Sequence, residues 1–129
     1  MSQPQPGQCY KGDMDTLYFL IGYDVILIII SHVVVGAISV GIMSAAFESA
    51  LSFSKSDARG GAEPIFGRQS VADLLMGVKM RIDASRFLTW KACHALDNGL
   101  GGELALEAKI YCSDLAVKSV MDCNSAVGM

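Results

Sequence analysis

The stretch KSDARGGAEPIFGRQSVAD, from Lys55 to Asp73, divides the chain into two long helical parts. Gly60 and Gly61 supply the positive φ angles with which helices commonly end. Pro64 prevents an immediate return to helix, because its ring removes a backbone donor and clashes with the preceding turn. The sequence therefore predicts that a first helix ends shortly before the two glycines.

The same stretch also predicts where the next helix begins. Ser70 and Asp73 form the S-x-x-D pattern of a capping box. Arg59 and Gln69 then lie at the two ends of a loop between two helices. A cation and an amide in such a position are suited to contact an anionic ligand.

Two amphipathic helices are expected after the loop. Apolar residues recur at intervals of three and four from about Val71 to Leu96, and again from Glu103 to about Ser125. Glycines punctuate the turn between them, in the segment DNGLGG (97–102). Both helices also carry apolar residues on a second side, among them Met76, Met80, Phe87, Leu106, Ile110, Val117 and Met121. We therefore expect each to be enclosed by neighbours, and three such helices to need a fourth helix, a partner subunit, or both.

The helix before the loop contains a series of small residues. They are Gly36, Ala37, Gly41, Ala45 and Ala46. Small residues at helical spacing allow another helix to approach closely. We interpret this series as tight packing inside an all-α bundle of three long helices.

The first thirty residues are different in composition. Residues 1–15 contain two of the three prolines and show no periodicity, which predicts a disordered or loosely attached tail. Residues 16–30 are almost entirely apolar and fit either a strand or a buried helix. We therefore treat 1–30 as a divergent N-terminal segment and 31–129 as the helical domain.

Residues 25–43 also satisfy the length of a membrane span, with Ser31 and His32 as the plainly polar interruptions. A histidine near mid-membrane is expensive, and no cluster of basic residues flanks the segment. The helical pattern also continues without a break to Ser54. A long buried helix is the favoured interpretation, and a small single-span membrane protein is the alternative.

Composition excludes several classes of function. The formal net charge is -3 and the ten basic residues form no patch, so nucleic-acid binding is not expected. The four cysteines have no C-x-x-C spacing and no adjacent histidine pair, which predicts small reduced core residues and no metal site. No secretory signal or peroxisomal tripeptide is recognised, so the cytoplasm is the default location.

Three runs of sequence resemble a known family. They are KSDARGG (55–61), QSVADLLMGVKMRIDASRFLTWKA (69–92) and KIYCSDLAVKSVMDCNSAVGM (109–129). They are similar to the C-terminal helical domain of the acyl-CoA dehydrogenase superfamily, and within it to the nitroalkane oxidases. The likeness extends over residues 31–129, and because members of that family are several times longer, the chain resembles a truncated piece of one.

The resemblance implies a flavin site. In that family the helical domain binds FAD together with a β-domain, and paired subunits each reach the neighbour's cofactor, so a homo-oligomer or helical partner subunit is implied. By motif, Arg59 and Gln69 correspond to residues that contact the FAD phosphates. Arg68 stands beside Gln69 where nitroalkane oxidases have a histidine, and Gly128 corresponds to a glycine in a turn near the adenosine.

No catalytic base is identified. In the resembled enzymes a carboxylate removes the substrate proton while the flavin accepts electrons, and no carboxylate here matches it. His32 and His94 lack the neighbours of a catalytic triad. We expect a truncated flavin-dependent oxidoreductase that is inactive alone; the alternatives are a non-catalytic helical interaction module and the single-span membrane protein.

Overall fold

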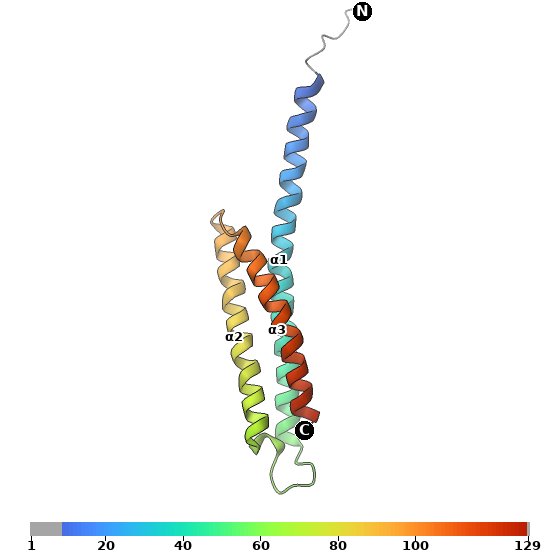
Figure 1. The fold of residues 1–129 in the computed structure, drawn as a ribbon, viewed down its shortest axis with the longest axis vertical. Coiled ribbons are helices and arrows are strands. Elements are labelled where there is room, and N and C mark those ends of the chain that lie inside the picture. Colours follow the sequence, from blue (N-terminus) through green and yellow to red (C-terminus); the bar gives the residue numbers. More distant parts are fainter. Residues whose placement is uncertain (1–8, 129) are drawn as a thin grey trace, which may run out of the picture.

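The computed structural model describes residues 9–128, and side chains from residue 14 onward. It contains three long helices, α1 (Cys9–Ser56), α2 (Gln69–Asp97) and α3 (Gly102–Gly128), and a short 3-10 turn, η1 (Ile65–Gly67) (Figure 1). No strand occurs among residues 9–128. The expected all-α bundle of three long helices is confirmed, and α2 and α3 begin and end within three residues of the predicted bounds.

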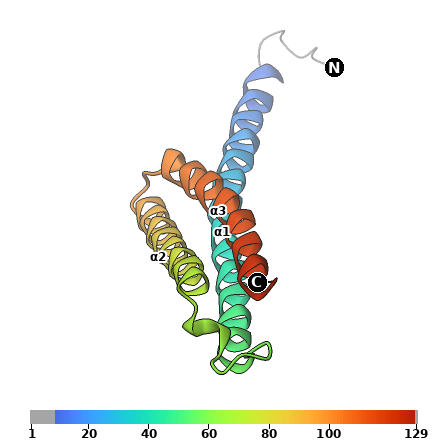
Figure 2. The same ribbon diagram turned by 60° about the horizontal axis from the view of Figure 1, so that its bottom comes forward.

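The helices form a bundle with one long member. α2 and α3 are antiparallel, and the C-terminal half of α1 packs against both (Figures 1 and 2). Consequently α1 and α3 end at the same end of the bundle, where α2 begins. The loop between α1 and α2 lies at this end, close to the end of α3.

A repeat close to 3.5 residues defines the core. In α2 the buried residues alternate at spacings of four and three: Val71, Leu75, Val78, Ile82, Ser85, Thr89 and Ala92. Those of α3 follow nearly the same spacing: Ala105, Ala108, Cys112, Ala116, Ser119, Cys123 and Ala126. Such a repeat keeps one face of each helix turned toward its neighbours, as in the packing of coiled coils.

The buried face of α3 consists only of alanine, cysteine and serine. The larger core side chains come from the other two helices, including Met43 of α1 and Val78 and Ile82 of α2. Because α3 contributes so little side-chain volume, it can approach both neighbours closely. An ion pair of 2.5 Å between Arg81 and Asp122 joins α2 to α3 beside this core.

Only part of the expected small-residue series of α1 is buried. Gly36 is buried and Ala46 is half-buried, whereas Ala37, Gly41 and Ala45 are exposed. A Cβ added at Gly36 would lie 3.4 Å from Thr89 Oγ1 and 3.6 Å from the carbonyl oxygen of Ala108. A single glycine therefore sets the close approach of the three helices at this level.

The second apolar sides of α2 and α3 are exposed. We call them the outward stripes: Met76, Met80, Phe87 and Trp90 on α2, and Ile110, Val117 and Met121 on α3. Phe87 and Trp90 contact each other edge to face, with ring centroids 5.6 Å apart. The three helices therefore cover only one face of each other, and the expected enclosure of the second faces by a fourth helix or a partner subunit stays a prediction.

The N-terminal half of α1 extends beyond the bundle (Figure 1). The predicted loose tail is wrong for residues 9–15, which are helical, while residues 1–8 lie outside the described part. The expected strand or buried helix at 16–30 is an exposed helix, since every side chain from Met14 to Ile28 is exposed and Ile29 is the first half-buried one. We call residues 14–30 the apolar stretch. The helix α1 continues without a break from this stretch into the bundle.

The suggested membrane span at 25–43 does not match the structure. Within it Val33, Ser39, Val40 and Met43 are buried among the three helices, so a span there would dismantle the bundle. α1 is still the one helix in the described chain that is long and apolar enough to cross a membrane.

The cysteines differ in burial. Cys112 and Cys123 are buried, as expected of small core residues, but Cys93 is exposed, and the side chain of Cys9 lies outside the described residues. Burial, followed by the neighbouring Asp122 carboxylate, raises the pKa of the Cys123 thiol, and Arg81 partly offsets this. Cys93 lies on the solvent side of α2 because the 3.5-residue repeat buries Ala92 instead.

Leucine at Gly36 should destabilise the bundle, whereas leucine at Gly41 should not. The G36L side chain overfills the contact with Thr89 and Ala108, which costs about 1–3 kcal/mol. Gly41 has nothing within 4 Å of an added Cβ, so G41L should gain up to about 1 kcal/mol from helix propensity. Thermal unfolding followed by circular dichroism measures both, and equal melting temperatures for the two variants would contradict this packing.

A thiol reagent should distinguish the cysteines. The thiolate is the species that reacts with iodoacetamide. At pH 8 the reagent should modify the exposed Cys93 in the folded protein. The buried Cys112 and Cys123 should react only after unfolding. Since the folded pKa of Cys123 lies above its unfolded value, its contribution to stability is fully present below about pH 8.5 and is lost as the pH rises through the folded value. Peptide mass spectrometry reads the order of labelling; early modification of Cys123 would contradict its burial.

Candidate functional site

The loop between α1 and α2 is held by its own backbone. The Ile65 N–H donates to the Asp57 carbonyl at 2.9 Å, and the Gly61 N–H donates to the Ala58 carbonyl at 2.8 Å. Ile65 is completely buried and fixes the loop to the bundle. At the rim, the Lys55 ammonium lies 5.7 Å from the centre of the Phe66 ring. The loop is therefore anchored at both sides of its turn.

Arg59 occupies an unusual backbone conformation. Its φ is 44°, in the left-handed region that side chains with a Cβ seldom adopt, and Gly60 follows with a φ of 74°. The Arg59 N–H donates to the Asp57 Oδ1 at 2.9 Å, which supports the turn. Of the two glycines expected to have a positive φ, only Gly60 has one. The other positive φ in this loop belongs to Arg59 and not to Gly61.

This conformation directs the Arg59 side chain toward the end of α3. Its Nη1 donates to the Gly128 carbonyl at 2.9 Å, and its Nη2 donates to the Val127 carbonyl. Its Nε lies 3.5 Å from the Asp57 Oδ2. A guanidinium at the C-terminal end of a helix satisfies free carbonyls and is attracted by the negative end of the helix dipole.

α2 begins two residues earlier than the capping pattern predicts. Its first residue is Gln69 and its N-cap is Arg68, which makes no side-chain cap hydrogen bond. Ser70 therefore lies inside the first turn, and Asp73 accepts a hydrogen bond from Gln69 Nε2 at 2.7 Å instead. The predicted Ser70–Asp73 capping box is wrong, because the 3-10 turn η1 leads directly into the helix.

The four residues singled out from the sequence lie at one end of the bundle. Arg59 and Gly128 are in direct contact, while Arg68 and Gln69 are at the start of α2, at this same end. All four are exposed. This end combines a guanidinium, an amide and the N-terminal end of a helix, a donor set that suits a phosphate or pyrophosphate.

The contacts within the chain do not use all the hydrogen-bond donors of Arg59. A guanidinium has five N–H donors, and two nitrogens of Arg59 donate to carbonyls of α3. The side chain is still one third exposed. Arg59 can therefore donate to a phosphate oxygen without leaving α3.

Two members of this arrangement were missed by sequence reasoning. Asp57 pairs with Arg59 through both the backbone and the side chain, and an aspartate two residues before a turn residue is a usable signal for such a turn. Val127 contributes only a carbonyl, which no side-chain pattern indicates. Its role depends on the end of α3 meeting the loop.

The other candidate residues do not form a site. His94 is exposed beside Asn98, and His32 is half-buried where α1 meets the bundle. Among the described side chains no group of three or more His, Cys, Asp or Glu is placed to hold a metal ion. A separate hollow of about 740 Å³ lies at the opposite end of the bundle, between the apolar stretch and the α2–α3 turn.

Comparison with known proteins finds the same family that the loop motif resembles. Residues 30–129 match the family model of the acyl-CoA dehydrogenase C-terminal domain. Over 104 residues the chain is 55% identical to a nitroalkane oxidase of Podospora anserina and 47% identical to one of Fusarium oxysporum. Each match covers 77% of this chain and 24% of the relative, so the chain spans about a quarter of the length of these relatives.

Solved structures show the same fold. The Podospora anserina nitroalkane oxidase superposes with a TM-score of 0.73 over 77% of this chain and 24% of that one. PigA, solved with FAD and proline, superposes with a TM-score of 0.71 at 26% identity, over 76% of this chain and 26% of that one. From the three-helix bundle, the arginine loop at its end and these similarities, the chain belongs to the acyl-CoA dehydrogenase family, through the C-terminal helical domain.

Proposed function

We propose that the arginine-loop end of the bundle contacts the phosphates of FAD in a flavin-dependent oxidoreductase of the nitroalkane oxidase type. Arg59 donates to the pyrophosphate, Gln69 and Arg68 contact it from the start of α2, and Gly128 allows close approach near the adenosine. FAD supplies the acceptor for the substrate's electrons when it is bound. Relatives at 46% identity are described as the flavoprotein nitroalkane oxidase, which supports this assignment.

The observation that carries the proposal is the position of Arg59. A non-glycine residue at a φ of 44° is strained by about 1–3 kcal/mol. Asp57, Gly60 and the end of α3 all support that conformation. Strain of this kind is retained where a side chain must be presented in one direction.

We also propose that the helical unit, residues 31–129, has no catalytic base of its own. None of its carboxylates corresponds to the base implied by the resemblance, and neither His32 nor His94 has a suitable neighbour. The reaction would then require residues outside this unit, with a nitroalkane or an acyl-CoA-like compound as substrate. A cytoplasmic location of the helical bundle goes with this proposal.

A second candidate is a non-catalytic helical interaction module. The outward stripes favour it, because exposed rows of methionine and aromatic side chains are typical of surfaces that meet another helix. A homo-oligomer or a helical partner subunit would cover them. This candidate needs no flavin, so flavin binding separates the two.

Replacing Arg59 with alanine should weaken FAD binding. A charge-assisted hydrogen bond contributes about 1.5–3 kcal/mol, so R59A should raise the dissociation constant for FAD by about tenfold or more. Titration of FAD fluorescence with the full chain measures this. R86A is the matched control, since Arg86 is half-buried on α2 away from the loop, where it pairs with Asp83.

The titration also tests the assignment itself. Equal FAD affinity of wild type and R59A would contradict a phosphate contact by this loop. Absence of FAD binding by the wild-type chain, together with a stable oligomer, would favour the interaction module instead. Circular dichroism of R59A confirms that the bundle is intact, because the Arg59 contacts lie at its rim.

A further inference from the structure

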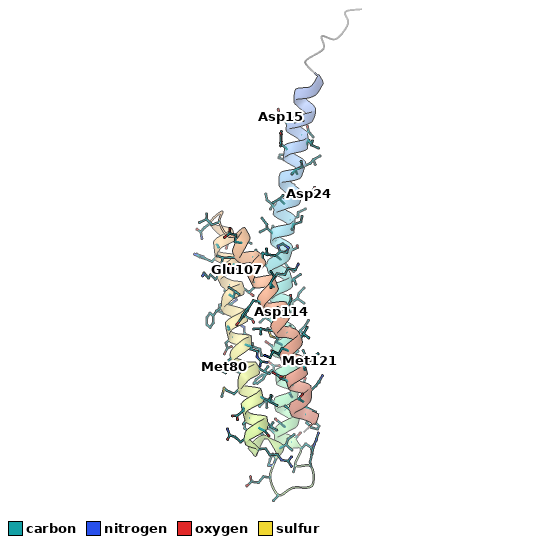
Figure 3. All side chains as sticks on the ribbon, in the orientation of Figure 1. Asp15, Asp24, Met80, Glu107, Asp114 and Met121 are labelled. Carbon is teal, nitrogen blue, oxygen red and sulfur yellow. The ribbon has the colours of Figure 1, made fainter. Side chains whose placement is uncertain are left out.

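Apart from Ile29, which packs against the bundle, the apolar stretch has no covering within the described chain. From Leu17 to Ile30 every residue except Tyr18, Gly22, Tyr23 and Asp24 is leucine, isoleucine, valine or phenylalanine. About half or more of the side-chain surface is exposed at most of these positions, for example 65% at Phe19 and 61% at Leu27. Figure 3 shows Asp15 and Asp24 along this free part of α1.

The exposure surrounds the helix on all sides. A helix that docks into a protein groove carries one apolar stripe, with polar residues on the opposite face. Here consecutive positions such as Ile26, Leu27 and Ile28 are all apolar and all exposed. A helix that is apolar all round needs an apolar surrounding on every side, which a lipid bilayer provides and a single groove does not.

The length of the free helix fits the same surrounding. At about 1.5 Å per residue, the apolar stretch extends about 26 Å; the hydrocarbon core of a bilayer is about 30 Å thick and thins locally around a shorter span. Polar residues stand at both ends, with Lys11, Asp13 and Asp15 on one side and Ser31 and His32 on the other.

A second apolar feature lies at the level where α1 leaves the bundle. Leu100, at the tip of the α2–α3 turn, is 71% exposed. The hollow of about 740 Å³ separates it from Ile26, Ile29 and Ile30. This end of the bundle therefore presents apolar groups toward the same side as the apolar stretch, away from the arginine loop.

We propose that the apolar stretch crosses the hydrocarbon core of a phospholipid bilayer and anchors the three-helix bundle to the membrane surface. The α2–α3 turn, with Leu100, then lies at the interface with the headgroups. Asp24 lies in the middle of the span and weakens the insertion, while Asp15 lies at its outer end. The arginine loop lies at the far end of the bundle, in water, so this anchoring is independent of flavin binding.

Flotation with vesicles tests the proposal. The full chain is purified in mild detergent, the detergent is removed in the presence of phosphatidylcholine vesicles, and the vesicles are floated through a sucrose gradient at pH 11 in sodium carbonate. The wild type should rise with the vesicles. The double variant I26K/I28K should float at least tenfold less, since its two lysines lie on opposite sides of the helix, and D24L should float at least as well as wild type.

The control is M80K/V117K, which places two lysines at equally exposed apolar positions on the bundle. It should float like the wild type, and circular dichroism of both double variants should show unchanged helix. Wild-type protein that stays in the lower gradient, whether as a discrete dimer or as an aggregate, would overturn the proposal. Equal flotation of I26K/I28K and wild type would overturn it as well.

Discussion

The close approach of three helices along small side chains is the constraint on which the rest of the structure depends. α3 buries only alanine, cysteine and serine, and a Cβ added at Gly36 of α1 would already touch Thr89. The volume of the core comes from Met43, Val78 and Ile82 on the other two helices. Interiors are packed at the density of organic crystals, so the distance between the helices follows from the volume of these side chains rather than from any single strong contact.

This packing places the arginine loop. Because α1 and α3 end together, the last carbonyls of α3 lie within reach of a residue three positions beyond the end of α1. α2 starts at the same end and directs its positive dipole end there. A group of polar residues thus comes together where α1 and α3 end and α2 begins, although none of these residues belongs to the core.

The opposite end of the molecule is governed by the same packing in a different way. α2 and α3 are shorter than α1, so the apolar stretch passes beyond them and no neighbour covers residues 14–28. The apolar stretch is exposed on all sides of the helix, whereas α2 and α3 expose their outward stripes on one side only. The two kinds of apolar surface therefore call for different surroundings, a continuous apolar medium for the first and a facing helix for the second.

The sequence by itself determined α2, α3, the end of α1 and the loop, because helical periodicity, glycine and proline act over a few residues. It also located Arg59, Arg68, Gln69 and Gly128 through motif resemblance. Only the tertiary structure decided that Arg59 bonds to carbonyls 68 and 69 residues away, that Ser70 and Asp73 form no capping box, and that Cys93 is exposed. The physical reason is that burial and long-range hydrogen bonds depend on which helices become neighbours, and the exposed residues 14–28 have none.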